Sequence, residues 1–487
     1  MTDIQYDLWE PVIGLEVHVQ LNTKSKLFSS APNRFGDEPN TNITEVCTGQ
    51  PGALPVLNKE AVKKAVQLGL AIQAHICPIS RFDRKSYFYP DSPRNFQITQ
   101  FEQPIIMGGV IIAEVDGTTH TFAVNRAHLE DDAGMLKHFS TFAGVDYNRA
   151  GVPLIEVVSE PCLRSAKEAV AYATALKAIM EYLDVSDCNM EESSLRVDAN
   201  ISVRLKTEKG LRNKIEIKNM NSFHNMEMAI DSEIRRQIHL YSQHPNEDPK
   251  KLLTSGTYRF NLEKKETVLM RQKEEAEDYK YFPEPDLLPI ILTQEYIEQI
   301  RKELPELPHD RFKRYTTKLE LSPSAASTLI NDKEMCLYFE ECLKYCTHAK
   351  TLCNWLLIEF VGRIKESGKT LTQIGVLPLH IANLVNMIET GTINGKIAKS
   401  VADDMLLSPE KDSKDIVREN PDYQPLDDTA SIEALIDTVL AENGQSIQDF
   451  KAGKIKAFAY LIGQVMKLCK GKASPTIVNE ILTKKLQ

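Results

Sequence analysis

The chain has 487 residues, with 58 Lys and Arg residues against 68 Asp and Glu residues and a formal net charge of −10. Hydrophobic residues make up 42% of it, which is typical of a globular protein and excludes disorder or collagen as a description of the whole chain. No apolar run approaches the ~18 residues of a membrane span, and the acidic residues 1–10 lack the features of a targeting peptide. The nine cysteines form no CxxC pair, so we expect reduced thiols in a cytoplasmic protein.

Alternating apolar and polar residues predict strands in the first part of the chain, over residues 13–21, 153–158, 195–205 and 214–220. Two helices interrupt them. Asn58 is positioned to cap one that runs to about Ala74, and Ser165 and Glu168 have capping-box spacing for the other. Many strands with few helices are typical of a mixed, largely antiparallel α+β domain.

Prolines at positions 283, 285 and 289 mark an exit from this domain. Beyond residue 292 the pattern is helical, with helices expected over residues 294–304, 322–346, 352–367 and 378–390. Pro409, Pro421 and many charges predict a linker over residues 408–425. We therefore expect an α+β domain over residues 1–294, an all-helical domain over 295–407, and a linker with a small helical tail domain over 408–487.

Charge is distributed unevenly near the C-terminus. Residues 403–442 hold 12 acidic and 3 basic residues, a net charge of −9, whereas residues 447–487 hold 8 lysines and 2 acids, a net charge of +6. A basic end on an acidic protein can bind a polyanion. A solvated helix face is the alternative.

The predicted strands carry unusual polar faces. Glu16, His18 and Gln20 share one face of the first strand, because alternate residues point the same way. A Glu-x-His pair offers oxygen and nitrogen ligands to a divalent cation, whereas an ordinary half-solvated sheet is the alternative. The segment His128-Leu-Glu-Asp-Asp adds three carboxylates whose repulsion a cation would relieve, and a solvated acidic turn before Gly134 is the competing interpretation.

Basic and aromatic residues alternate over residues 81–97 and again over residues 271–282. This mixture suits phosphate groups and a stacked base. The alternative is a buried aromatic loop whose arginines reach solvent.

Several longer motifs resemble the B subunit of the glutamyl/aspartyl-tRNA amidotransferase, over nearly the whole chain. They are EPVIGLEVHVQL (10–21), PGALPVLN (51–58), HLEDDAG (128–134), NRAGVPLIEVVSEP (148–161), MEESSLRVDAN (190–200), EIKNMNSF (216–223), DYKYFPEPD (278–286), GTINGKIAK (391–399) and GQVMK (463–467).

The resemblance implies an antiparallel-sheet cradle, a helical domain and a tail that grips tRNA. It implies that ATP and Mg²⁺ activate the side-chain carboxylate of mischarged Glu-tRNA(Gln) or Asp-tRNA(Asn), and that ammonia then displaces phosphate. The implied partners are an amidase A subunit that releases the ammonia, a small C subunit and the mischarged tRNA, with the cognate non-discriminating synthetase as a further candidate. A non-catalytic tRNA-binding scaffold is the alternative.

Matching the motifs residue by residue assigns roles to individual positions. The catalytic and Mg²⁺ candidates are Glu16, His18, Glu130 and Glu156, with Asp198 and Glu191 as weaker ones. The candidates for nucleotide or acceptor-end contacts are Arg84, Lys85, Tyr87, Arg94, Arg196 and Arg271. The candidates for the tRNA-binding tail are Lys451, Lys454, Lys456, Lys467 and Lys470.

Two segments depart from relatives. Where some relatives carry four zinc-binding cysteines, this chain has Ser29, Ala31, Thr44 and Cys47, so we expect no zinc site. The Gln-Glu-Thr-Arg loop of relatives is Ser-Gly-Thr-Tyr here, over residues 255–258, and no contact is carried over from it.

Overall fold

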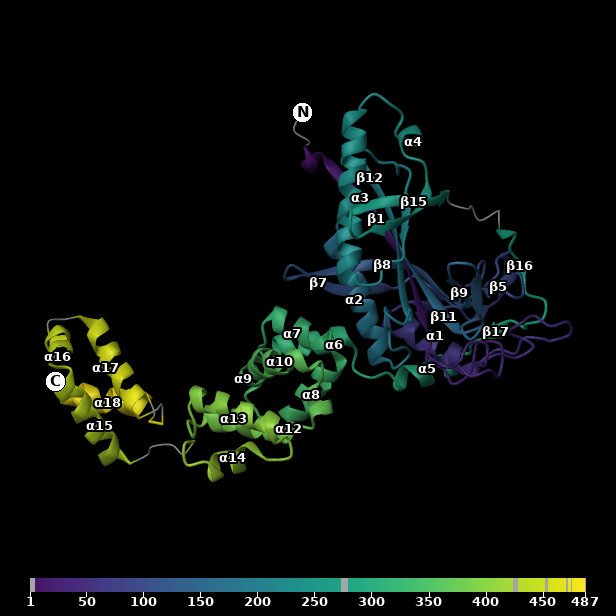
Figure 1. Ribbon diagram of the computed structural model, residues 1–487. Helices are drawn as coiled ribbons and strands as arrows, with labels where there is room; N and C mark the ends of the chain where they lie inside the picture. The colour runs from purple at the N-terminus through teal and green to yellow at the C-terminus, as the bar shows by residue number, and fades with distance from the viewer. Residues whose placement is uncertain are drawn as a thin grey trace. The chain divides into compact units, whose positions relative to one another are not determined.

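The computed structural model describes residues 5–272, 279–423, 428–451, 454–469, 472–473 and 475–486. Contacts between Cα atoms divide the chain into two compact units, Met1–Phe312 and Lys313–Gln487 (Figure 1). The first unit combines strands and helices, and the described part of the second is entirely helical. The α+β fold class expected from the sequence is confirmed, while its division into three domains stays a prediction.

A ten-stranded sheet forms the centre of the first unit. Its order is β15-β14-β13-β12-β1-β11-β8-β6-β2, with β7 beside β8, and each pairing is antiparallel except that of β13 with β14. The strands are β1 (Trp9–Gln20), β2 (His75–Ile76), β6 (Ile106–Met107), β7 (Val110–Val115), β8 (Thr118–Asp131), β11 (Pro153–Ser159), β12 (Leu195–Leu205), β13 (Ile215–Lys218), β14 (Gly256–Asn261) and β15 (Glu266–Gln272). The four predicted strands are therefore confirmed, as β1, β11, β12 and β13.

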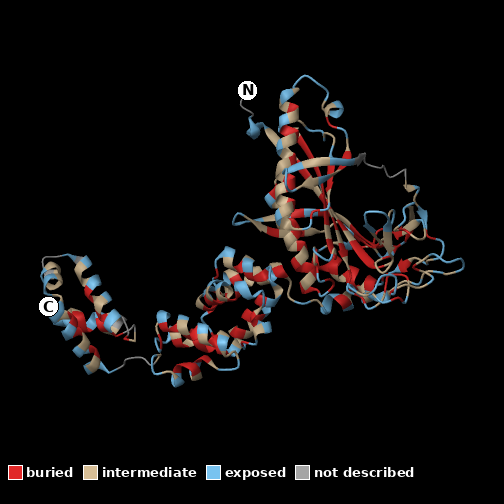
Figure 2. Ribbon diagram, viewed as in Figure 1, coloured by how far each residue is buried: buried red, intermediate tan, exposed pale blue. Residues whose placement is uncertain are grey.

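Helices cover the apolar face of this sheet. Leu15, Val17 and Val19 of β1 are fully buried in the same core as residues of α1 (Lys59–Ala71), α2 (Ala166–Tyr182) and α3 (Phe223–Gln243). Figure 2 shows this core as buried stretches along the strands and along the helices beside them. The predicted caps are present, because the Asn58 side chain accepts from Glu60 N–H and the Ser165 side chain accepts from Glu168 N–H.

Short strands extend the rim of the unit. The segment Asp83–Ser86 (β4) pairs with both Phe96–Thr99 (β5) and Phe282–Pro283 (β16), which brings two basic-aromatic stretches together. The remaining elements of this unit are η1 (Tyr6–Leu8), β3 (Ile79–Ser80), β9 (Met135–His138), β10 (Ala143–Asp146), α4 (Pro249–Leu252), β17 (Ile290–Ile291) and α5 (Gln294–Lys302).

The segment expected to be a loop, residues 255–258, lies largely in a strand. Residues 256–258 begin β14, and Thr257 lies opposite Glu216 of β13. The Thr257 hydroxyl donates to the Glu216 carboxylate at 3.0 Å, and both residues are buried. This segment is therefore tied to the polar face of the sheet.

Two expectations for the helical part are wrong. Residues 322–346 form two helices, α7 (Pro323–Ile330) and α8 (Lys333–Leu343), because the Asp332 side chain accepts from Met335 N–H and starts a new helix. The expected linker over residues 408–425 contains α14 (Ser413–Glu419), which packs against α12 (Pro378–Glu389) and α13 (Gly395–Leu407) and buries Ile416 and Val417.

The other helices of this part follow in chain order. They are α6 (Pro308–Thr317), α9 (Ala349–Asn354), a π-helical stretch (Trp355–Phe360), α10 (Val361–Ile364), a 3-10 turn (Lys365–Ser367), α11 (Leu371–Ile374), α12 (Pro378–Glu389) and α13 (Gly395–Leu407). The last four are α15 (Thr429–Glu442), α16 (Gly444–Lys451), α17 (Ile455–Leu468) and α18 (Pro475–Leu486), which surround a core of their own.

Candidate metal and anion site

Strand register places a row of charged side chains on the polar face of the large sheet. His18 of β1 lies opposite Arg196 of β12 on one side and Glu156 of β11 on the other, and Glu156 lies opposite His128 of β8. Side chains directly opposite in neighbouring strands point to the same face and lie close together. Glu130 joins them from β8, because residues two apart in a strand share a face.

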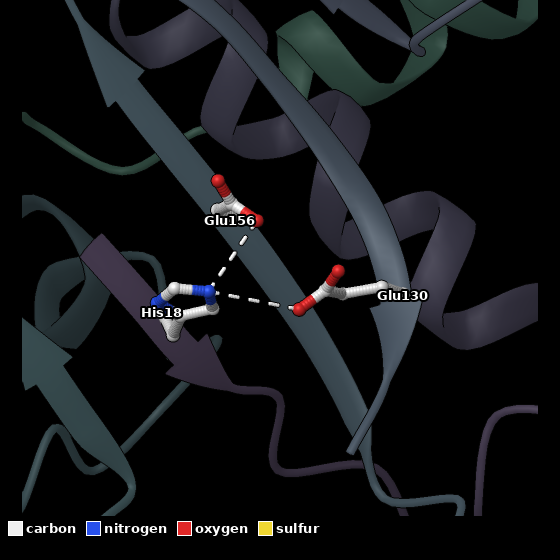
Figure 3. A group of neighbouring side chains, drawn as sticks. All are labelled: His18, Glu130 and Glu156. Carbon is white, nitrogen blue, oxygen red and sulfur yellow. Dashed lines mark ion pairs between the residues drawn. The ribbon is translucent and has the colours of Figure 1, made fainter. Parts of the chain in front are cut away.

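Three of these side chains could hold one cation together. Ligand atoms of His18, Glu130 and Glu156 all lie within 4.8 Å of one another. Figure 3 shows the imidazole of His18 facing both carboxylates, Glu156 on β11 and Glu130 on β8. Its Nε2 atom lies 3.3 Å from Glu156 Oε2 and 3.7 Å from Glu130 Oε1. One imidazole nitrogen and two carboxylates form a donor set suited to a divalent cation.

Burial and charge act in opposite directions on this cluster. Burial disfavours the charged imidazolium, but the Glu156 and Glu130 carboxylates outweigh it and raise the pKa of His18 to about 9. Burial also disfavours the charged carboxylates. The neighbouring histidines nevertheless lower the pKa of Glu156 and of Glu130 below their usual range. Without a cation, the cluster thus favours two carboxylates neutralised in part by a protonated imidazole.

The remaining metal candidates lie apart from this trio. Glu16 shares the polar face, but its Oε1 accepts from Asn200 Nδ2 at 2.8 Å. Asp198 pairs with Lys218 at 2.7 Å. Glu191 is exposed in a turn. The geometry therefore brings together three of the four principal candidates, and Glu16 is their neighbour along β1.

The three consecutive acids of residues 130–132 are all buried, so the solvated-turn interpretation is wrong. They also face different partners. Glu130 faces the histidines, Asp131 pairs with Arg94 and accepts from Ile98 N–H, and Asp132 pairs with Arg196 at 2.9 Å. The three carboxylates of residues 130–132 therefore contact three different sets of partners and do not bind one cation together.

A cavity of about 290 Å³ opens beside the trio. Its charged lining residues are His18, Lys85, Asp91, Arg94, Glu130, Asp131, Asp132, Arg149, Arg196 and Lys218, and its aromatic ones are Tyr87, Phe96 and Tyr279. Lysines and arginines next to two carboxylate ligands and aromatic rings can accommodate a phosphorylated ligand with its cation.

Four of the six predicted nucleotide or acceptor-end residues line this cavity, namely Lys85, Tyr87, Arg94 and Arg196. The Lys85 ammonium lies 4.7 Å from the centre of the Tyr279 ring. Arg84 points elsewhere, since its guanidinium binds Glu284 at 2.7 Å and Asp286 at 3.1 Å. The side chain of Arg271 lies outside the described residues.

Sequence reasoning missed three residues of the site, namely His128, Arg149 and Lys218. His128 was visible in the HLEDD motif and Lys218 in the polar alternation of its strand, but neither pattern indicates what the side chain meets. Arg149 Nε lies 3.6 Å from Asp132 and donates to the Ala133 carbonyl at 3.0 Å. Its position depends on a loop after β10, which no periodicity predicts.

The positions that match the cysteines of relatives do meet in space. Ser29 Oγ lies 3.2 Å and Thr44 Oγ1 3.5 Å from Cys47 Sγ, and the buried Lys26 Nζ lies 3.7 Å from the same sulfur. Ala31 donates its N–H to Ser29 Oγ. This chain therefore has one thiol with hydroxyl and ammonium neighbours at those positions.

The described tail lysines differ in their contacts. Lys454 pairs with Asp449 at 3.0 Å. Lys456 and Lys467 lie exposed on α17, and neither has an acidic partner within 4 Å in the part of the chain that is described. The side chain of Lys451 and the whole of Lys470 lie outside it. No helix among the described residues is both long and apolar enough to cross a membrane.

Comparisons with known proteins agree with this architecture. Residues 11–298 match the family described as the GatB/GatE catalytic domain, and residues 337–486 match the GatB domain. The chain is 67% identical over 478 residues to the B subunit of the aspartyl/glutamyl-tRNA(Asn/Gln) amidotransferase from Protochlamydia amoebophila, covering 98% of this chain and 97% of that one. It is 58% identical to the protein of the same name from Chlamydia abortus, with 99% of both chains covered.

Proposed function

This chain belongs to the GatB family, and from that membership we propose that it is the subunit of a tRNA amidotransferase that amidates an amino acid already attached to tRNA. The substrates are Glu-tRNA(Gln), Asp-tRNA(Asn) or both. The observation that carries the catalytic part of the proposal is the buried cluster of His18, Glu130 and Glu156 beside a cation-lined cavity.

The reaction has two steps. First, a side-chain carboxylate oxygen of the aminoacyl group attacks the γ-phosphorus of ATP, and the bond to ADP breaks. Then the nitrogen of ammonia attacks the acyl carbon, the bond to phosphate breaks, and one proton leaves as the amide forms. Both partners of the first step are anions, so the site must hold negative charges close together.

The trio fits a divalent cation such as Mg²⁺, because its ligand atoms lie within 4.8 Å of one another and two of its three members are carboxylates. A bound cation would neutralise phosphate charge there. His18 and the carboxylates of Glu130 and Glu156 would hold it. Glu16, two residues before His18 on β1, is a further candidate ligand. One of its carboxylate oxygens already accepts from Asn200, so its role is tested by a variant of its own.

The basic residues of the cavity hold the anionic groups of the substrates. Lys85 has no carboxylate within 4 Å in the described part of the chain, so its charge is available to a phosphate or carboxylate. Arg94 and Arg196 are oriented by Asp131 and Asp132, and they present fixed donors to the cavity. The aromatic rings of Tyr87 and Tyr279 offer stacking surfaces for a base.

The proposal includes partners and a location. Ammonia comes from an amidase A subunit, a small C subunit completes a heterotrimer, and the tail domain contacts tRNA through its lysines. The cognate synthetase is a further candidate partner, and the assembly is placed in the cytoplasm. The support for these points is the family membership and the net charge of +6 over residues 447–487.

The proposal is tested by transamidation in the reconstituted complex, with mischarged tRNA(Gln) and tRNA(Asn) assayed separately. We expect Glu156→Gln to lower the ATP-dependent rate on the order of 100-fold, because it removes a negatively charged group at the proposed site of phosphoryl transfer. Hydrolysis of glutamine by the partner amidase should continue.

Glu263→Gln, in an exposed turn between β14 and β15, makes the same chemical change away from the site and should leave the rate unaltered. Full transamidation by the Glu156→Gln complex would refute the catalytic role of the trio. Comparing Glu16→Gln in the same assay decides whether Glu16 acts with it.

A non-catalytic tRNA-binding scaffold is the second candidate. It keeps the basic tail but needs neither the trio nor the cavity. Mg²⁺-dependent binding of a non-hydrolysable ATP analogue to the complex separates the two, because a scaffold has no reason to bind it.

A further inference from the structure

A second imidazole lies against the same two carboxylates. His128 Nε2 is 3.4 Å from Glu156 Oε2 and 3.7 Å from Glu130 Oε2. His18 Nε2 lies near the same Oε2 of Glu156 but near the other oxygen, Oε1, of Glu130. Each carboxylate is therefore contacted by two imidazoles, one from β1 and one from β8.

The environment of His128 determines which nitrogen carries its hydrogen. The residue is only 4% exposed, and its Nδ1 atom is buried without a hydrogen-bond partner among the described residues. A neutral imidazole carries one N–H, and a buried N–H without an acceptor is unfavourable. The hydrogen is therefore favoured on Nε2, where the Glu156 carboxylate at 3.4 Å can accept it.

This tautomer gives the two histidines different roles. A nitrogen that carries a hydrogen has no lone pair for a cation, so His128 can donate to Glu156 but cannot ligate through Nε2. His18 Nε2 belongs to the group of atoms that could ligate one ion. On the other side, the Thr99 hydroxyl donates to Glu130 Oε2 at 3.2 Å, which restrains that carboxylate further. Hydrogen bonds from such neighbours commonly fix the orientation of metal ligands.

We propose that His128 is a positioning residue, which donates from Nε2 to Glu156, lies against the Glu130 carboxylate, and holds both carboxylates in the orientation that binds the cation with His18. This inference rests on the proposed function of the trio and adds a residue to it. It explains why a buried histidine lies in the same cross-strand row as His18 while its second nitrogen remains without a partner among the described residues.

The test uses the full-length chain and Mn²⁺ alone, with affinity measured by electron paramagnetic resonance of the free ion. The amide nitrogen of glutamine reaches about as far as Nε2, whereas that of asparagine stops near Nδ1. We expect His128→Asn to weaken Mn²⁺ binding by about 10- to 100-fold. His128→Gln should restore binding to within about 3-fold of the wild type, because a donor again reaches the carboxylates.

His120→Gln, on the same strand and outside the cluster, is the matched control and should bind Mn²⁺ like the wild type. Both variants place a side-chain amide of similar polarity at the buried position 128, so a general loss of folding would affect the two variants alike. Equal Mn²⁺ affinities in the two variants, at any value, overturn the positioning role.

Electron spin echo spectra of the bound Mn²⁺ separate positioning from ligation. We expect one coordinated imidazole nitrogen in the wild type and in His128→Gln, and none in His18→Gln. Two coordinated imidazoles in the wild type would make His128 a ligand and overturn the proposal. A wild-type chain that binds no Mn²⁺ would instead refute the cation site itself, and with it this inference.

Discussion

Cys47 illustrates how a single side chain acquires its chemistry from its neighbours. Burial alone raises a thiol pKa, but the contacts with Ser29 and Thr44 and the charge of Lys26 outweigh it and lower the pKa of Cys47. At Cys188 the contact with Ser186 and the charge of Lys177 compensate only in part, and burial raises its pKa to about 12. Cys47 also lines the cavity beside the trio. Reactivity follows the thiolate fraction and access, so the two thiols should differ strongly.

At pH 7.5 we expect iodoacetamide to alkylate Cys47 at least ~10-fold faster than Cys188, with the sites resolved by peptide mass spectrometry. Ser29→Ala should slow the reaction of Cys47, because one contact that favours the thiolate is lost. Equal alkylation rates at Cys47 and Cys188 in the folded protein would contradict this account.

At the scale of elements, the polar face of the sheet is a set of linked strand contacts. Thr257 of β14 donates to Glu216 of β13, whose other carboxylate oxygen lies 3.6 Å from Lys218. Lys218 in turn pairs with Asp198 of β12 and lines the cavity. Burial opposes the charge on Lys218, but Asp198 and Glu216 outweigh it and raise its pKa. Strand β14 thus supports a residue of the site.

Thr257→Val removes the hydroxyl but keeps the branched shape. We expect it to lower the free energy of unfolding by about 1–3 kcal/mol, because a buried carboxylate oxygen loses a donor. Urea unfolding followed by Trp9 fluorescence, in a Trp355→Phe background, measures the first unit. Thr257→Ser retains the donor and serves as the control, so a valine variant as stable as the serine variant would exclude an energetic role for this bond.

At the scale of the whole molecule, the candidate metal site and the basic end of the chain lie in different units. The first holds the acidic trio and its cavity, whereas the last helices hold most of the lysines of the basic end. Lys456 and Lys467 are 11 residues apart on α17, which is about three helical turns and places them on one face. Salt-dependent attraction to phosphates is the expected use of such a face.

Replacing both lysines by glutamine, Lys456→Gln with Lys467→Gln, should weaken tRNA binding by the complex and flatten its dependence on salt. The slope of log K against log salt should fall by up to about two units, roughly one for each lost phosphate contact. Binding of Mn²⁺ should be unaffected. Lys365 and Lys369 are exposed elsewhere in the helical unit. The pair Lys365→Gln with Lys369→Gln changes the net charge equally and should alter neither the tRNA affinity nor the salt slope. Identical salt slopes for the two double variants would remove the tail lysines from the tRNA interface.

The sequence by itself determined the faces of the strands and much of the site. The alternation along β1 assigned Glu16 and His18 to the polar face, because side chains in a strand alternate by geometry alone. Caps such as Asn58 were equally readable, since a cap depends on residues only two or three positions away. The family resemblance supplied Glu130 and Glu156, which alternation could place on a face but could not bring to His18.

Only the tertiary structure decided which of these residues meet. The order of β12, β1, β11 and β8 aligns His18 with Glu156 and His128, which lie 138 and 110 positions away in the chain. The same pairing of distant segments directs Arg84 to Glu284 and away from the cavity. Local periodicity contains no information about strand order, because hydrogen bonds between strands are indifferent to which side chains they bring together. The sequence therefore predicted which strand face each residue of the site occupies, but it did not predict which residues are in contact.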